Sequence, residues 1–373
     1  MAAQKPIRLG MVGGGEGSFI GYVHRIASRL DGEYDLVAGA LSSRPEVARR
    51  SAEALGIAPD RAYEHFDAMA KAEAARHDGI EAVAIVTPNH MHSAPVKAFL
   101  EAGIHVICDK PLTATLAEAN SLAEVKPKNG ARFLLSHNYT GYPMIRVARA
   151  LVAEGRLGTL RVAHVEYAQD WLTEPLSNKQ ADWRADPAKA GPGGCIGDIG
   201  THAYNLLRFA SGLELEAVSA DLNIFVAGRK VDDNVHMMLR FQGGARGMLW
   251  ASQVAPGNEN GIAIRIYGDR GGLEWRHSDA NTLWVSEFGQ PTQRLTRGSA
   301  GADIPIAGHR IPPGHPEGYF EAFATLYREF AGVIRGTSQG NQLPGLADGL
   351  EGMRFVAVAV ASSAAGAKWV AFG

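Results

Sequence analysis

Two short segments of the chain carry side chains that could perform proton chemistry. In Asp109-Lys110-Pro111 a lysine stands between an acid and a proline, directly after the apolar run Val106–Cys108. A second segment, rich in glycine, ends with Asp198 and His202 four positions apart. A partly desolvated lysine has its pKa lowered toward the range of a general acid or base. An imidazole beside a carboxylate is a tunable proton acceptor.

Each segment also has an ordinary structural explanation. A lysine at the end of a strand can simply extend its ammonium group into water. Asp198 can cap the start of a helix, with His202 on the surface or in the core. Catalysis therefore becomes the better interpretation only if other elements of the chain position these residues.

A glycine-rich turn near the N-terminus could bind a nucleotide. An apolar strand is predicted over residues 7–12 and a helix over residues 22–30. Between them, Gly13 suits a tight turn, and Gly15 would let backbone N–H groups approach a pyrophosphate at the positive end of the helix. The order of strand, turn and helix is the one that a dinucleotide fingerprint requires.

The turn departs from the G-x-G-x-x-G pattern. Ser18 stands where the third glycine is expected, and the glycine that opens the helix, Gly21, comes three positions later. We therefore predict a lengthened phosphate loop, and its expected cofactor contacts include Ser18, Phe19 and Ile20.

Strands and helices alternate through the first third of the chain. Further strands are predicted at 36–41, 82–86, 106–108 and 132–136, and helices at 45–55, 91–102 and 115–125. This alternation implies crossover connections and a doubly wound parallel sheet, so we predict an α/β dinucleotide-binding domain over residues 1–137.

The end of the second predicted strand bears on the choice of cofactor. It reads Ser42-Ser43-Arg44 and lacks the acid that would hold an adenosine ribose diol. Hydroxyls and a guanidinium suit a 2′-phosphate, which favours NADP. Arg44 could equally stack on adenine or face solvent, and NAD then remains an alternative.

Composition narrows the class of protein. The 373 residues allow two domains, because single cores stop growing at roughly 250 to 300 residues. Basic and acidic residues number 37 and 39, so neither nucleic acid nor an anionic membrane is an expected partner. Cys108 and Cys195 lack metal-ligand spacing and are too few for a disulfide framework, so no metal is expected. The sequence shows no signal-like or membrane-length apolar run, which favours the cytoplasm.

The organisation changes after about residue 137. Successive strands are predicted at 160–167, 217–226, 234–241, 246–254, 263–267 and 282–286, which implies an antiparallel sheet in a second, α+β domain over residues 138–373. Residues 296–316, rich in glycine and proline, are expected to form a long loop. Helices are predicted at 203–209, 319–334 and 346–361.

Several motifs together resemble one family. Gly21 to His24, Thr87-Pro88-Asn89-His90-x-His92, Asp109-Lys110-Pro111 and Gly-Asp198-x-Gly-x-His202 occur in an order that is similar to the Gfo/Idh/MocA oxidoreductases. That family pairs a Rossmann domain with an α/β domain built on a large open antiparallel sheet, and it oxidises or reduces sugars and cyclitols with NAD(P). Asp109 replaces the usual Glu of the lysine motif, and the phosphate loop is longer than usual.

The resemblance implies a set of site residues. Lys110, Asp198 and His202 would form the catalytic group in a cleft between the two domains. His202 would accept the hydroxyl proton, Lys110 would bind the same oxygen, and Asp198 would orient the site or bind a neighbouring hydroxyl. The resemblance leaves open whether Lys110 or His202 is the base. The expected cofactor set comprises Gly13, Gly15, Ser18, Phe19, Ile20, Ser42, Ser43, Arg44, Thr87, Asn89, His92, Asp109 and Lys110, with Asn89 and His92 near the nicotinamide.

The substrate is expected to be a small polyhydroxylated molecule. Aromatic and polar side chains of the second half could hold a sugar, a glycoside or a cyclitol, and the product could be a 3-keto sugar. The expected substrate contacts are Lys110, Tyr139, Trp171, Trp183, Asp198, His202 and His315. The resemblance also implies a homodimer or homotetramer. The alternative is a catalytically silent dinucleotide-binding regulator on the same fold, which would have no need of all three catalytic residues.

Overall fold

The chain forms two compact units. The computed structural model describes residues 5–176, 183, 186–299 and 309–373. One unit contains the residues up to Asn138 together with Tyr319–Leu350, and the other contains Tyr139–Gly318 and Glu351–Gly373. The segment Tyr319–Leu350 thus belongs to the first unit, whereas the sequence predicted an uninterrupted second domain from residue 138.

A parallel sheet of five strands forms the centre of the first unit, with the order β2-β1-β3-β4-β5. The strands are β1 (Ile7–Gly13), β2 (Tyr34–Ala40), β3 (Ala82–Val86), β4 (His105–Cys108) and β5 (Phe133–Leu135). All residues of β3 are buried, as in a strand whose two faces are both covered. The chain places β2 and β3 on opposite sides of β1, so the order reverses there. Ligands of open α/β sheets bind beyond the carboxyl ends of the strands at such a reversal.

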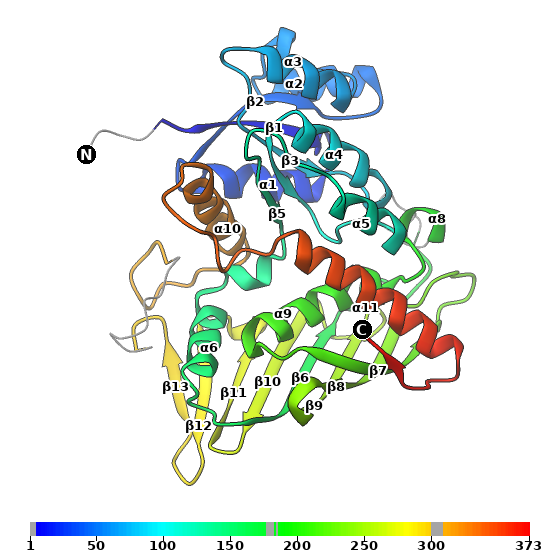
Figure 1. Ribbon diagram of the computed structural model, residues 1–373, viewed down its shortest axis with the longest axis vertical. Coiled ribbons are helices and arrows are strands. Elements are labelled where there is room, and N and C mark those ends of the chain that lie inside the picture. Colours follow the sequence, from blue (N-terminus) through cyan, green and yellow to red (C-terminus); the bar gives the residue numbers. More distant parts are fainter. Residues whose placement is uncertain (1–4, 177–182, 184–185, 300–308) are drawn as a thin grey trace. The chain divides into compact units, whose positions relative to one another are not determined.

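Helices connect and cover these strands (Figure 1). They are α1 (Phe19–Leu30), α2 (Pro45–Ala54), α3 (Phe66–Ala75), α4 (Ser93–Glu101), α5 (Leu116–Ala123) and α10 (Tyr319–Ile334). Phe323 and Tyr327 of α10 are buried in the same hydrophobic cluster as Val23 of α1 and Leu9 of β1. This apolar packing explains why α10 belongs to the nucleotide-binding unit, and the predicted doubly wound α/β class is confirmed.

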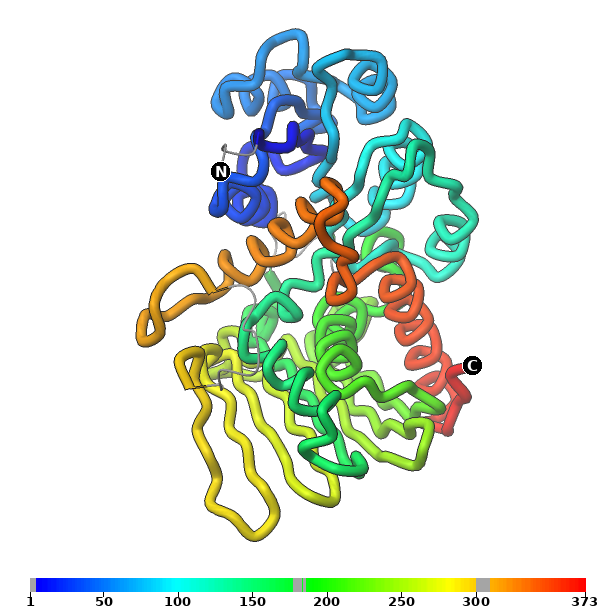
Figure 2. Tube along the Cα trace, turned by 60° about the vertical axis from the view of Figure 1, so that its left-hand side comes forward, coloured from blue at the N-terminus to red at the C-terminus, as the bar shows by residue number. Residues whose placement is uncertain are grey.

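The second unit contains a sheet of nine strands, ordered β13-β12-β11-β10-β6-β9-β8-β7-β14. Figure 2 follows it from the yellow hairpins at one edge to the short red β14 at the other. The strands are β6 (Leu160–Ala168), β7 (Leu215–Asn223), β8 (Asn234–Phe241), β9 (Arg246–Ser252), β10 (Gly261–Gly268), β11 (Gly271–Arg276), β12 (Thr282–Glu287), β13 (Gln293–Thr296) and β14 (Val370–Ala371). Only the β6–β9 pair among these strands is parallel, which confirms the mostly antiparallel sheet.

The helices of this unit are α6 (Pro143–Ala153), α8 (Pro187–Ala190), α9 (Thr201–Ser211) and α11 (Leu346–Ala364), the last of which spans the boundary between the units. Tyr204 of α9 stacks on Phe355 of α11, with ring centroids 4.2 Å apart. None of the helices in the described part of the chain combines the length and hydrophobicity that a membrane crossing requires.

Some elements differ from the sequence prediction. The strand β11 was missed because its opening Gly271-Gly272 is typical of a turn, and β13 was missed because it is mostly polar. The helices α3 and α6 were also not predicted. The long loop predicted over residues 296–316 falls partly on residues 300–308, which lie outside the described residues.

Candidate active site

The glycine-rich turn joins β1 to α1 in the first unit. Gly13 and Gly14 have φ angles of 76° and 75°, which L side chains rarely adopt. The helix begins at Phe19, and Ser18 caps it by accepting a hydrogen bond from the Gly21 N–H at 3.1 Å. A Cβ atom at Gly21 would lie 2.4 Å from the Gly14 Cα. Gly21 therefore performs the task of the missing third glycine, which is close packing of the helix against the turn.

The start of α1 offers hydrogen-bond donors to an anion. The first turn of any α-helix leaves its N–H groups without intrahelical partners. Ser18 uses the N–H of Gly21, and its carbonyl accepts from Tyr22. The N–H groups of Phe19 and Ile20 are the remaining donors of this turn, at the positive end of the helix dipole. These donors fit the pyrophosphate of a dinucleotide.

Gly15 differs from its expected role. Its N–H donates to the Leu41 carbonyl at 3.1 Å, and a Cβ atom at Gly15 would lie 2.7 Å from the same oxygen. Gly15 therefore fixes the loop against the end of β2, and its own N–H is not directed at a phosphate. The sequence could not show this, because the partner lies 26 positions away, just past the end of β2.

The residues after β2 lie at the entrance to α2. Ser42 accepts the Arg44 N–H on its Oγ at 3.1 Å, and Ser43 and Arg44 are exposed. Their hydroxyl and guanidinium groups are therefore accessible to the adenosine half of a cofactor.

Thr87, Asn89 and His92 follow β3, the strand paired with β1. The methyl group of Thr87 would lie 2.9 Å from a Cβ atom on Gly13, so this loop borders the glycine-rich turn. His92 differs from the expectation that its ring faces the nicotinamide. It is fully buried, and its two ring nitrogens lie 2.8 Å from the carbonyl oxygens of Pro111 and Thr87. The ring thus ties this loop to the lysine motif.

Asp109 is likewise an internal residue and not an evident cofactor contact. Its Oδ1 accepts from the Ser136 hydroxyl at 2.8 Å and lies 3.6 Å from Nε2 of His24. Burial opposes ionisation of Asp109, but the nearby His24 imidazole and Lys110 ammonium, with the Ser136 hydrogen bond, lower its pKa to about 2. Asp109 is therefore a buried carboxylate next to Lys110 in the chain, and Lys110 is itself half-buried. The lysine follows β4, next to β3, so it belongs to the same carboxyl edge of the sheet as the glycine-rich turn.

Asp198 and His202 lie close together in the chain of the second unit. Asp198 belongs to a π-helical turn, η4 (Ile196–Gly200), and His202 to the first turn of α9, which continues it. Such π turns often occur at functional sites. Gln253, which sequence reasoning missed, donates from Nε2 to Oδ2 of Asp198 at 2.9 Å. The His202 ring meets the Tyr139 ring edge to face, with centroids 5.1 Å apart.

Tyr139 supports the imidazole and differs from the expectation of a free substrate contact. Only 2% of Tyr139 is exposed, and its hydroxyl lies 2.6 Å from that of Tyr167. The Nδ2 of Asn260 donates to the same Tyr139 hydroxyl at 3.1 Å, and Tyr167 donates to Oδ1 of Asn260 at 2.7 Å. The aromatic face against His202 is thus fixed by a closed hydrogen-bond network. Tyr167 and Asn260 carry no sequence motif that could have revealed them.

Trp171 connects with this network through a glutamine. Its Nε1 donates to Oε1 of Gln169 at 2.9 Å, and the Nε2 of Gln169 donates to Asn260 at 2.8 Å. Trp171 is half-buried, so part of its ring remains accessible.

The other predicted substrate residues lie in less regular segments. Trp183 is half-buried, and the residues on either side of it are outside the described part of the chain. His315 is exposed, with Nδ1 3.2 Å from the carbonyl of Pro312 in its own loop.

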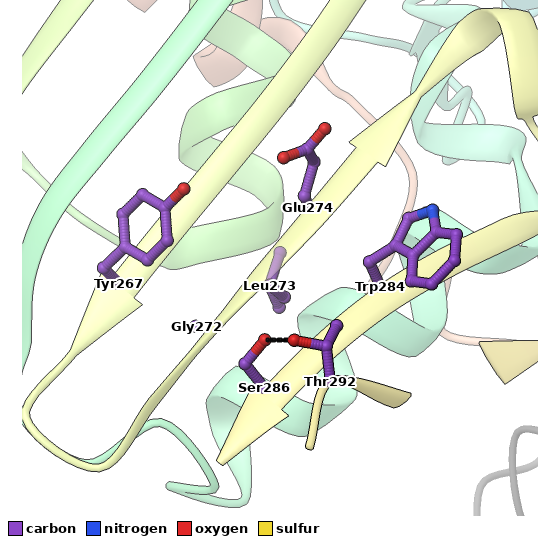
Figure 3. A pocket seen from close by; sticks show the side chains of 7 residues that line it. All are labelled: Tyr267, Gly272, Leu273, Glu274, Trp284, Ser286 and Thr292. Carbon is purple, nitrogen blue, oxygen red and sulfur yellow. Dashed lines mark hydrogen bonds between the residues drawn. The ribbon is translucent and has the colours of Figure 1, made fainter. Parts of the chain in front are cut away.

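A shallow hollow on the nine-stranded sheet contains none of the predicted site residues. Figure 3 shows the rings of Tyr267 and Trp284 on either side of Glu274, with Ser286 Oγ and Thr292 Oγ1 2.8 Å apart.

Comparisons with known proteins show the family of this chain. A family model for the oxidoreductase family with an NAD-binding Rossmann fold matches residues 7–137, and the GFO/IDH/MocA C-terminal domain matches residues 145–274. The chain is 52% identical to an oxidoreductase from Sinorhizobium meliloti of known structure, with a TM-score of 0.89 and 98% and 100% of the two chains covered.

Two further relatives have named ligands or activities. An inositol dehydrogenase homolog from Azotobacter vinelandii, solved with NADH and myo-inositol, is 37% identical, with a TM-score of 0.91 and 98% of each chain covered. Levoglucosan dehydrogenase from Pseudarthrobacter phenanthrenivorans is 29% identical over 98% of this chain and 97% of its own length.

The fold and the site define a class of protein, the dinucleotide-dependent oxidoreductases with a Rossmann unit and a second α+β unit. Within that class, the chain belongs to the Gfo/Idh/MocA family. It is an NAD(P)-dependent dehydrogenase.

Proposed function

We propose that this dehydrogenase oxidises a secondary alcohol of a sugar, glycoside or cyclitol to the ketone, or catalyses the reverse reduction. The observation that carries the proposal is the arrangement of Asp198 and His202, which Gln253 and Tyr139 hold in defined positions. Relatives named as inositol and levoglucosan dehydrogenases support the same substrate class. Bound NAD(P)+ would supply a hydride acceptor.

The protein's own residues have separable roles in this proposal. His202 accepts the proton of the reacting hydroxyl as the carbonyl forms, and in the reverse direction it returns that proton. Lys110 donates a hydrogen bond to the same oxygen and stabilises its developing negative charge. Asp198 orients the site or binds a neighbouring hydroxyl of the substrate. Tyr139 packs edge to face against the His202 imidazole and fixes the orientation of that ring.

A substrate panel tests the proposal. Cyclitols, free aldoses and glycosides, including 1,6-anhydro sugars, would be assayed with each cofactor by the absorbance of the reduced nicotinamide. We expect turnover with at least one of these classes, and product analysis would show which carbon is oxidised, including whether a 3-keto sugar forms. Tight nucleotide binding without turnover on the whole panel would contradict the substrate class.

We further propose a preference for NADP, on the basis of the accessible Ser42-Ser43-Arg44 segment. Arg44→Asp should weaken NADP binding by about 10- to 100-fold, because a charge-assisted hydrogen bond contributes about 1.5–3 kcal/mol. NAD binding should change little. Arg49→Asp, at another exposed arginine on the same helix, is the matched control. Isothermal titration measures the dissociation constants of NADP and NAD. If their ratio is the same in Arg44→Asp as in the wild type, the proposed preference is refuted.

We also propose that the open face of the nine-stranded sheet binds a second copy of this chain. Met238 of β8 and Met248 of β9 are paired in register, and 52% and 55% of them are exposed. Adjacent exposed apolar side chains of this kind are suited to burial in a protein–protein interface. A dimer formed through it would bury the same patch of both subunits.

Met248→Glu should convert this assembly to monomers, since each interface would bury unpaired charge. Light scattering measures the mass, and Leu30→Glu, at an exposed leucine of α1, is the control. A wild-type chain that is monomeric at micromolar concentration would contradict the proposal.

A further inference from the structure

The turn that precedes Asp198 is held by a single buried residue. Asp232 accepts the Gly194 N–H on Oδ1 at 2.6 Å and the Ile196 N–H on Oδ2 at 2.8 Å. Its backbone carbonyl accepts the intervening N–H of Cys195 at 2.8 Å. Three consecutive amides therefore converge on one residue. Asp232 is 6% exposed, so these contacts are shielded from water.

The glycines of this segment permit such close contact. A Cβ atom on Gly194 would lie 2.3 Å from the Asp232 carbonyl oxygen and 2.7 Å from a methyl group of Val231. The same turn then continues into η4, where the Asp198 N–H donates to the Gly194 carbonyl at 2.9 Å. The backbone position of Asp198 thus depends on the anchoring of Gly194 by Asp232.

The next residue in the chain supports the Asp198 side chain. The carbonyl of Asp233 accepts the backbone N–H of Gln253 at 2.8 Å. The Nε2 of that glutamine donates to Oδ2 of Asp198 at 2.9 Å. Gln253 is 2% exposed, and Asp233 is 1% exposed. Two adjacent residues before β8 therefore constrain Asp198 twice, once through its backbone and once through its carboxylate.

We propose that Asp232 and Gln253 are positioning residues for the reaction. Asp232 fixes the turn that carries Asp198 toward His202, and Gln253 fixes the direction of the Asp198 carboxylate. This inference rests on the catalytic roles proposed above for Asp198 and His202. Misplacement of a reacting group by about 1 Å can reduce the rate by about two orders of magnitude, so the effect should be large without direct contact to substrate.

Burial raises the pKa of the Asp232 carboxyl to about 6, although its hydrogen bonds from Ile196 and Gly194 oppose the shift. At pH 8 it is therefore ionised, and both oxygens act as acceptors. An asparagine in its place presents one acceptor oxygen and one amide group that would face an N–H donor. Asp232→Asn thus removes one of the two hydrogen bonds that the side chain accepts from Gly194 and Ile196, while keeping the size of the side chain.

The experiment measures turnover of the full-length protein at pH 8, per mole of nucleotide-binding sites, on a substrate found in the panel. Asp232→Asn should lower kcat about 10- to 100-fold, and Gln253→Met, which retains the bulk but not the amide, about 5- to 50-fold. Cofactor dissociation constants should stay within about twofold of wild type. Asp221→Asn, at an exposed carboxylate of β7, should keep full turnover.

A double-mutant cycle separates positioning from mere stability. In an Asp198→Asn background, Asp232→Asn and Gln253→Met should each lower kcat by less than about threefold, because the carboxylate that they position is already absent. Equal losses in both backgrounds would overturn the inference, and so would unchanged kcat in the two folded single variants. If Asp232→Asn does not fold, the inference is tested by Gln253→Met alone, measured with and without Asp198→Asn. Unchanged turnover in Asp198→Asn itself would instead refute the proposed catalytic role, and the inference with it.

Discussion

Replacing Lys110 or His202 with alanine should lower turnover by about two to four orders of magnitude, the scale of general acid–base catalysis. The His202→Ala variant lacks the proposed proton acceptor. The Lys110→Ala variant lacks the ammonium group that is proposed to stabilise negative charge on the oxygen of the reacting hydroxyl. Cofactor affinity should remain nearly unchanged, because neither side chain is needed for the pyrophosphate contacts of the glycine-rich turn. Steady-state kinetics and nucleotide titration on the same preparations measure both quantities.

Matched variants make this result specific. Lys97→Ala, at an exposed lysine of α4, and His65→Ala, at an exposed histidine before α3, should retain full turnover. Because the proposed groups act as a unit, the Lys110/His202 double variant should lose far less than the product of the single losses. Wild-type turnover in both single variants on a true substrate would refute the catalytic assignment.

The pH dependence of the single variants would also identify the base. If His202 is the acceptor, loss of its imidazole should remove the ionisation that limits kcat/KM on the acidic side of the profile. Lys110→Ala should keep that limb. The opposite result would assign the proton to Lys110, the alternative that the motif leaves open.

Gly21→Ala should weaken nucleotide binding by about 10- to 100-fold. An alanine within a helix is normally more stable than a glycine by about 1 kcal/mol. Here, however, its Cβ would lie 2.4 Å from the Gly14 Cα, so the phosphate turn must move away from α1. The loss of one charge-assisted contact, worth about 1.5–3 kcal/mol, gives the expected effect.

Gly352→Ala provides the control for this variant. Gly352 lies within α11, and nothing stands within 4 Å of the position of an added Cβ. The same chemical change should therefore leave nucleotide affinity intact. Titration calorimetry would compare the two proteins, with thermal unfolding as the check on folding. Equal dissociation constants in both variants would show that the turn from Gly13 to Gly21 does not hold the cofactor.

The sequence was informative where the physical cause is local. Apolar runs of strand length, helical periodicity and the turn residues between them predicted all five strands of the first sheet, as well as α10 to its observed bounds. Lys110 and His202, to which we assign the proposed catalytic roles, were singled out for the same reason, and they lie after β4 and in the first turn of α9. The strand β11 was missed because its first residues, Gly271 and Gly272, are typical of a turn, although in the structure they pair with neighbouring strands of the sheet.

The sequence alone determined the α/β and α+β classes, the order of the motifs and the residue types available for chemistry. Only the tertiary structure decided which of those residues are buried and hydrogen-bonded to other parts of the protein. His92 and Asp109 carry the right functional groups for a site, yet burial and partners on distant elements direct them inward. Asp232 and Gln253 lie 38 and 55 positions from the residues they hold, Gly194 and Asp198. Such long-range contacts depend on how the strands of the sheet are paired, and no local sequence pattern specifies that pairing.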